Sequence, residues 1–243
     1  MASDDIMSGW DLFLELESEL KRKNRFFPNK KFLRLFDKII ADVANQESVL
    51  AGTYLYRARR NKIGEDFTRI SEVGVNHENP ANNRASPRGI PYMYLADDEE
   101  TASAEIRANV NDTITVATFK AKRELKFLTL ENGGTASCSA EEEFDSSDIA
   151  GFILLLSYSF AKPTHNPEVE YLISQFFSAY CQAAGFDGVR YISSARGFHG
   201  DCSKNHYNYV LFDEANVEYV EAYKYKIEGI TYDIKKGDVV HLK

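Results

Sequence analysis

The chain has 243 residues, of which 44% are hydrophobic and 13% aromatic, so it can bury a sizeable core in one large domain or in one domain with an appendage. Its formal net charge of −8 argues against direct nucleic-acid binding, because phosphate backbones demand clustered Lys and Arg. The N-terminus is acidic where a signal peptide is basic, and every apolar run is shorter than the ~20 residues that span a bilayer. The three cysteines show no paired spacing, which fits a reducing compartment. We therefore expect a cytoplasmic protein without membrane contact.

The first part of the chain has the pattern of two amphipathic helices. Apolar residues at spacings of three and four predict helices over Trp10–Lys23 and Phe32–Val43. We interpret residues 1–48 as a helical N-terminal extension that is regulatory or oligomer-forming and stands outside the ligand site. The main domain then covers residues 49–243.

The main domain opens with two strands separated by a long polar segment. Strands are predicted over Thr53–Ala58 and Tyr92–Ala96, and Asn61–Pro91 between them is rich in turn-forming Asn, Gly and Pro. Segments of this length without regular structure are usually functional or mobile. The doublet Arg59-Arg60 ends the first strand and is interpreted as solvated.

A helix that carries an isolated acid follows the second strand. Asp97 with Glu100 three residues later has the form of a capping box, so the helix is expected to begin at about Asp98. Glu105 lies on the same face as Ala102, Ile106 and Asn109. If that face packs on the preceding strand, the carboxylate is buried and needs a cation or hydrogen-bond donors. The arginines available as partners are Arg57, Arg84 and Arg88. A structural ion pair and a functional role both stay open here.

The rest of the chain mixes strands and helices. The predicted elements are strands over Thr113–Lys120, Leu125–Leu130, Val189–Ser193 and Asn208–Asp213, helices over Ile149–Ala161 and Glu168–Ala184, and two or three strands over Val217–Leu242 with turns at Gly229 and Gly237. A chain break is expected at Asn132-Gly133-Gly134. The aromatic stripe of the second helix, Phe176, Phe177 and Tyr180, is expected in the core.

Two other constellations are weaker. His199, Cys202 and His206 offer metal ligands, but zinc sites usually show paired ligands with a distant second pair, so we favour a polar surface loop and expect no metal. Ser193, His199 and Asp187 offer a hydrolase triad, yet no Gly-x-Ser-x-Gly pattern occurs.

Five pieces of sequence resemble the RES domain family, bacterial toxins named for their Arg, Glu and Ser. The pieces, in order from Tyr54 to Asp213, are YRARR, NRASPRGIPYMYLA, TASAEI, GFDGVRYISS and NYVLFD. The resemblance implies an α+β fold, a mixed central β-sheet flanked by helices and related to ADP-ribosyltransferases, here with the helical extension before an NAD-binding catalytic domain at 49–243. Known members degrade NAD or transfer its ADP-ribose to a protein, and they are usually encoded beside an Xre-like antitoxin that blocks the cleft.

The resemblance also implies the site residues. The family's two arginines, strand tyrosine, glutamate and serine fall on Arg57, Arg84, Tyr94, Glu105 and Ser193, with Ser194 as the alternative serine. It implies that Glu105, Arg57 and Ser193 are catalytic. It further implies that NAD is bound by Arg57, Arg84, Tyr94 and Ser193. The family's typical loop reads Gly-Arg-Trp, whereas this chain has Asn83-Arg84-Ala85, so an aromatic wall of the pocket is missing or supplied from elsewhere.

The chemistry of NAD agrees with these residue types. Its pyrophosphate calls for guanidinium forks, its cationic ring for an aromatic face, and its ribose for a nearby carboxylate. Breaking the nicotinamide–ribose bond develops an oxocarbenium-like cation, while nicotinamide leaves as a neutral molecule, so one acid is enough. Ser193 is expected to hydrogen-bond the ligand rather than to act as a nucleophile. Water, phosphate or a protein remains open as the acceptor, and a non-catalytic nucleotide-binding or partner-binding member of the fold is the alternative.

Overall fold

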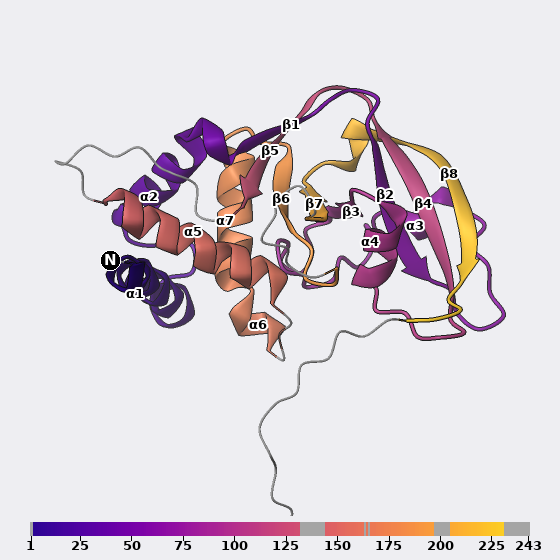
Figure 1. Ribbon diagram of the computed structural model, residues 1–243, viewed down its shortest axis with the longest axis horizontal. Coiled ribbons are helices and arrows are strands. Elements are labelled where there is room, and N and C mark those ends of the chain that lie inside the picture. Colours follow the sequence, from indigo (N-terminus) through magenta and orange to yellow (C-terminus); the bar gives the residue numbers. More distant parts are fainter. Residues whose placement is uncertain (1, 132–143, 163, 165, 197–204, 231–243) are drawn as a thin grey trace, which may run out of the picture.

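The computed structural model describes residues 2–131, 144–162, 164, 166–196 and 205–230, which form one mixed sheet with helices around it (Figure 1). The strands are β1 (Gln46–Val49), β2 (Tyr54–Arg60), β3 (Met93–Ala96), β4 (Thr113–Ala121), β5 (Leu125–Leu130), β6 (Gly188–Ile192), β7 (Tyr207–Leu211) and β8 (Val217–Lys226). Their order in the sheet is β1-β5-β6-β7-β3-β2-β4-β8. Strands β5 and β6 are parallel and the other neighbours are antiparallel. The predicted α+β fold is confirmed.

The helices fall into two groups around this sheet. They are α1 (Ala2–Arg22), α2 (Lys30–Ala41), α3 (Ile70–Val73), α4 (Glu99–Glu105), α5 (Ser146–Ala161), α6 (Pro167–Glu170) and α7 (Leu172–Ala183). Helices α1, α2, α5 and α7 gather beside β5 and β6, whereas α4 lies on β2, β3 and β4 (Figure 1). In the described part of the chain, no helix is both long and apolar enough to cross a membrane.

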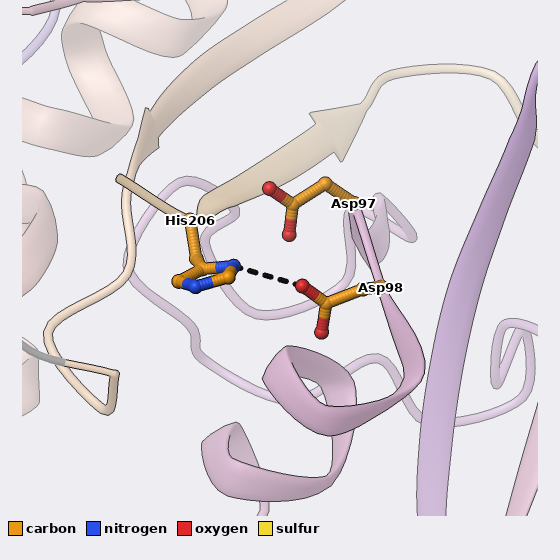
Figure 2. Close-up of side chains that lie close together, drawn as sticks. All are labelled: Asp97, Asp98 and His206. Carbon is orange, nitrogen blue, oxygen red and sulfur yellow. Dashed lines mark hydrogen bonds and ion pairs between the residues drawn. The ribbon is translucent and has the colours of Figure 1, made fainter. Parts of the chain in front are cut away.

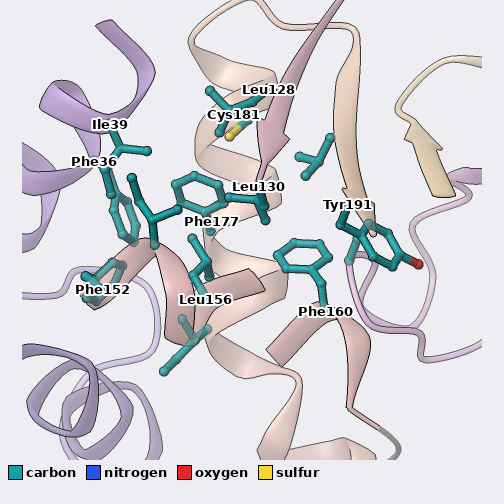
Figure 3. Close-up of a cluster of buried hydrophobic side chains, with 14 of the residues drawn as sticks. Phe36, Ile39, Leu128, Leu130, Phe152, Leu156, Phe160, Phe177, Cys181 and Tyr191 are labelled. Carbon is teal, nitrogen blue, oxygen red and sulfur yellow. The ribbon is translucent and has the colours of Figure 1, made fainter. Parts of the chain in front are cut away.

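The largest core lies between the first group of helices and the sheet. Helix α2 buries Phe32, Leu35, Phe36 and Ile39 completely, as their spacing of three and four predicts. The Phe36 ring lies 4.9 Å from that of Phe177 in an edge-on contact, and both belong to one cluster with residues of α1, α5, β5 and β6 (Figure 3). The helices before residue 48 and the elements after it therefore share a core.

Helix α1 crosses α5 at a pair of glycines. A Cβ built on Gly9 would lie 2.5 Å from the backbone carbon of Gly151, closer than real side chains ever approach. Glycine at this position therefore lets the two helix backbones touch. The boundary at residue 48 stays a proposal about domains, but the packing across it is continuous.

Phe36→Ala is expected to lower the free energy of unfolding by about 3–5 kcal/mol, because it leaves a cavity in this core. That is a large part of the roughly 5–15 kcal/mol by which a domain is stable. Denaturant unfolding of the full chain measures the loss. Phe26→Ala is the matched control, because that ring is 76% exposed. Equal stability of the two variants would contradict the burial of α2.

The predicted capping box is wrong by one residue. The carboxylate of Asp98 caps α4 by accepting from the backbone N–H of Thr101 at 2.6 Å. Asp97 instead accepts from the backbone N–H of Tyr207 at 2.9 Å, so its side chain is engaged with β7 and cannot cap the helix. The helix ends at Glu105, and Asn109 is therefore not on its face.

Further elements differ from the prediction, among them the short helix α3 within Asn61–Pro91, where no regular structure was expected. The single helix expected over Glu168–Ala184 is two, α6 and α7, which meet at Tyr171. Strand β1 was not predicted, because its four residues do not alternate clearly. The described part of the tail holds one long strand, β8, while the break expected at residues 132–134 and the turn at Gly237 lie outside the described residues.

Candidate functional site

A cavity of about 420 Å³ opens where β2 and β3 separate. These two strands pair only at Tyr56 and Ala96, so side chains from both faces of β2 reach the space beyond that pair. The volume is within the range of small-molecule sites, about 300–1,000 Å³. Its charged, amide and aromatic lining includes Tyr56, Arg57, Arg59, Asn76, Arg84, Tyr94, Glu105, Tyr171, Tyr191 and Asn208.

Glu105 is the carboxylate of this cavity, and it is held by two neutral donors. Its Oε1 accepts from Ser193 Oγ at 2.6 Å and from Asn208 Nδ2 at 2.7 Å. Among the described residues no cation forms an ion pair with it, and Oε2 has no hydrogen-bond partner. Arg88, one of the three expected partners, instead lies 3.9 Å from Glu168. The prediction of a structural ion pair for Glu105 is therefore wrong. Its Oε2 is available to a ligand.

Ser193 lies behind Glu105 rather than in the cavity. Its side chain is completely buried, it is outside the set of lining residues, and its backbone N–H donates to the carbonyl of His206 at 2.8 Å. The hydroxyl is thus a support for the acid. Ser194 turns away and donates to the carbonyl of Ala161 at 2.8 Å, so Ser193 is the serine next to the site.

Asn208 was missed from the sequence. It is 5% exposed on β7 and lines the cavity. The available signal was a lone amide within an otherwise apolar and aromatic strand, because a buried polar group requires a partner.

Two arginines of β2 line the cavity. Arg57 Nη1 donates to the carbonyl of Tyr94 at 2.8 Å, across the gap between β2 and β3, and Arg59 Nη2 donates to the carbonyl of Gly74 at 2.8 Å. Desolvation lowers the pKa of Arg57 to about 9, and the charge of Arg59 adds to the shift. Desolvation also lowers the pKa of Arg59. The interpretation of Arg59 as solvated is wrong, whereas Arg60 is exposed and pairs with Asp112 at 3.2 Å.

Arg84 and Tyr94 fix the loop that precedes β3. Arg84 Nη1 donates to the carbonyl of Phe160 at the end of α5. The Tyr94 hydroxyl accepts from the backbone N–H of Ala85 at 3.1 Å and shares a hydrogen bond of 3.1 Å with Ser86 Oγ. Burial raises the pKa of Tyr94, so it stays a neutral phenol. Both residues line the cavity while they hold the loop in place.

Tyr92, at the end of this loop, lines the cavity, and further aromatic walls come from other elements. Ala85, which stands where the family has Trp, is completely buried and does not line the cavity. Tyr171, at the junction of α6 and α7, and Tyr191 of β6 do line it. Burial raises the pKa of Tyr191, and the negative charge of Glu105 adds to the shift, so this phenol stays neutral beside the acid.

His206, which we expected in a polar surface loop and not in a metal site, is partly buried at the start of α4. Its Nδ1 lies 2.8 Å from Asp98 Oδ2, and Asp97 is close by (Figure 2). Burial raises the pKa of Asp97. The pair of His206 and Asp98 ties the helix that carries the acid to β7. His199 and Cys202 lie outside the described residues.

The hydrolase triad is not assembled by the residues that the structure describes. The carboxylate of Asp187 pairs with Arg123 at 2.5 Å and accepts from the backbone N–H of Lys126 at 2.8 Å. Ser193 donates to Glu105 instead.

Comparisons with known proteins give a family match and a similarity to a solved structure. A model of the RES domain matches residues 54–233, which include all of the site residues above. No curated protein matches the chain. Among solved structures, the chain is similar to a chain in the crystal structure of the M. tuberculosis MbcT-MbcA toxin-antitoxin complex, with 11% identity, a TM-score of 0.42, and coverage of 79% of this chain and 92% of that one.

Proposed function

The chain belongs to the RES domain family, and on this premise we propose that it is the toxin of a toxin–antitoxin pair and that it cleaves the nicotinamide–ribose bond of NAD. The observation that carries the proposal is the state of Glu105. One carboxylate oxygen is fixed by Ser193 and Asn208, and the other has no described partner, in a cavity bordered by arginines and tyrosines.

The residues divide the work according to their chemistry. Arg57 and Arg84 bind the phosphates, and Tyr94 with its neighbouring tyrosines faces the cationic ring. As the bond between C1′ and the nicotinamide nitrogen breaks, its electron pair leaves with nicotinamide. The positive charge that develops on the ribose is stabilised by the free oxygen of Glu105. An acceptor atom then forms a bond to C1′, and a proton carried by a water or protein acceptor passes to the solvent.

Three acceptors are consistent with this chemistry, and their products differ. Water gives ADP-ribose, phosphate gives ADP-ribose phosphate, and a protein acceptor gains the mass of one ADP-ribose. We propose an Xre-like antitoxin as the partner that blocks the cavity. Nothing in the proposed reaction requires a metal.

Incubation of the purified chain with NAD tests the proposal. We expect release of nicotinamide, followed by chromatography, with and without phosphate and with a cell extract as the source of protein acceptors. Mass spectrometry of the products identifies the acceptor. Binding of NAD without release of nicotinamide under all three conditions would favour the non-catalytic alternative.

Ser193→Ala is expected to reduce turnover about ten- to a hundredfold with little change in KM, because a hydrogen bond to a charged group contributes roughly 1.5–3 kcal/mol. Asn208 would still hold Glu105, so some activity remains. The measurement is nicotinamide release at varied NAD concentration. Ser194→Ala is the matched control and should turn over like wild type. A KM effect without a turnover effect would mean that Ser193 contacts the substrate and does not position the acid.

A further inference from the structure

Arg57 and Arg59 form a pair of cations that the described chain does not neutralise. They are two residues apart on one face of β2, and both line the cavity. Within the described residues, each guanidinium makes one hydrogen bond, to the backbone carbonyl of Tyr94 and of Gly74 respectively. In both side chains Nε is buried without a partner. Among the described residues no carboxylate forms an ion pair with either arginine.

The described groups around Arg57 and Arg59 compensate their positive charges only weakly. The Cα atoms of residues i and i+2 of a strand are roughly 6–7 Å apart. The charge of Arg59 contributes to the lowered pKa of Arg57, so the two cations repel each other in a partly desolvated space. Glu214 is the carboxylate whose charge acts on Arg57, but its two oxygens are already engaged by His77 at 2.6 Å and by the backbone N–H of Val75 at 3.3 Å. An anion with two charges, entering the cavity, would compensate both arginines at once.

We propose that Arg59 is a second phosphate-binding residue of β2, which holds the pyrophosphate of the ligand together with Arg57 on the same strand and Arg84 on the loop before β3. The identity of the ligand as NAD rests on the proposed function, whereas the pairing of two cations with a diphosphate does not. A guanidinium matches phosphate with two parallel donors, and each arginine has donors left over from its backbone contact. Arg60, the neighbour of Arg59, points to the other face of the strand and pairs with Asp112.

The test is calorimetric titration of the full chain with ADP-ribose, which carries the pyrophosphate and has no nicotinamide bond to cleave. Arg59→Gln is expected to weaken binding about ten- to a hundredfold, and Arg59→Lys, which keeps the charge but loses the fork, by a smaller factor. Arg60→Gln is the matched control and should bind within about twofold of wild type. Nicotinamide riboside, which lacks the pyrophosphate, should bind all four proteins equally.

The outcomes separate this inference from the proposed function. Wild-type affinity of a folded Arg59→Gln for ADP-ribose would overturn the inference and leave the cleavage of NAD untouched. An equal loss for nicotinamide riboside, or failure of both Arg59 variants to fold, would also overturn it, because either result assigns Arg59 a structural role. If the wild type releases no nicotinamide from NAD but binds inorganic pyrophosphate, and Arg59→Gln loses that binding, the inference stands and the NAD proposal fails.

Discussion

Glu105→Gln should reduce the cleavage of NAD by about a hundred- to a thousandfold or more, the range seen when a preorganised electrostatic group is removed from an active site. The amide keeps the volume of the side chain, and its oxygen still accepts from Ser193 and Asn208, so the fold is expected to survive. What it lacks is the negative charge that offsets the cation developing on the ribose. Nicotinamide release measures the effect, and thermal unfolding checks the fold.

The control for this variant comes from the same helix. Glu100 lies on the first turn of α4, has a side chain that is 75% exposed and pairs with Arg196 at 2.6 Å. Glu100→Gln removes one negative charge from α4 without touching the cavity, so its turnover should match wild type. Near wild-type turnover of Glu105→Gln, with the control behaving as expected, would show that another group stabilises the cation.

The sequence analysis singled out Glu105 as a candidate site residue, but it did not predict which groups hydrogen-bond to its carboxylate. Glu105 was conspicuous as a charge on a helical face with alanine and isoleucine. Its two donors, Ser193 and Asn208, lie 88 and 103 residues further along the chain. Helical periodicity describes only neighbours within a few residues. The arginines were expected because a buried carboxylate needs a cation or donors, whereas the fold supplies a hydroxyl and an amide.

Arg59 shows a similar limit. The alternation of β2 places it on the side of Arg57, and this could be read from the sequence. Its burial could not, because it depends on the separation of β2 from β3 after a single pair at Tyr56 and Ala96. A strand end is solvated in an ordinary sheet, whereas here it borders a cavity.

The fold was predictable wherever one periodic pattern dominated. Helix α2 and the positions of strands β3 and β7 along the chain followed from apolar spacing. Which of two equivalent carboxylates caps α4 was not predictable. Asp97 and Asp98 are both suitable N-cap residues, but Asp97 accepts a hydrogen bond from the backbone N–H of Tyr207, so Asp98 caps the helix. The packing of α2 against α7 through Phe36 and Phe177 was also not predictable, because the two residues are far apart in the sequence.

Arg57→Ala is expected to lower the affinity for NAD at least about ten- to a hundredfold while changing the melting temperature little. Each charge-assisted contact with phosphate is worth roughly 1.5–3 kcal/mol. Loss of the bond to the carbonyl of Tyr94 costs about 1 kcal/mol, but a buried cation without a counterion is removed at the same time, so the two effects oppose each other. Arg57→Lys should weaken binding by a similar factor, because the planar fork is lost.

Arg84→Ala should behave differently, and the contrast makes the assignment testable. Its guanidinium joins the loop before β3 to the carbonyl of Phe160, so its removal is expected to lower the melting temperature by roughly 3–12 °C as well as to weaken NAD binding. Arg88→Ala is the control for both, because that exposed side chain makes only a 3.9 Å ion pair with Glu168. Thermal melting and NAD titration of Arg57→Ala, Arg84→Ala and Arg88→Ala distinguish a role in phosphate binding from a structural role. A large fall in the melting temperature of Arg57→Ala with unchanged NAD affinity would make Arg57 a structural residue and remove it from the phosphate site.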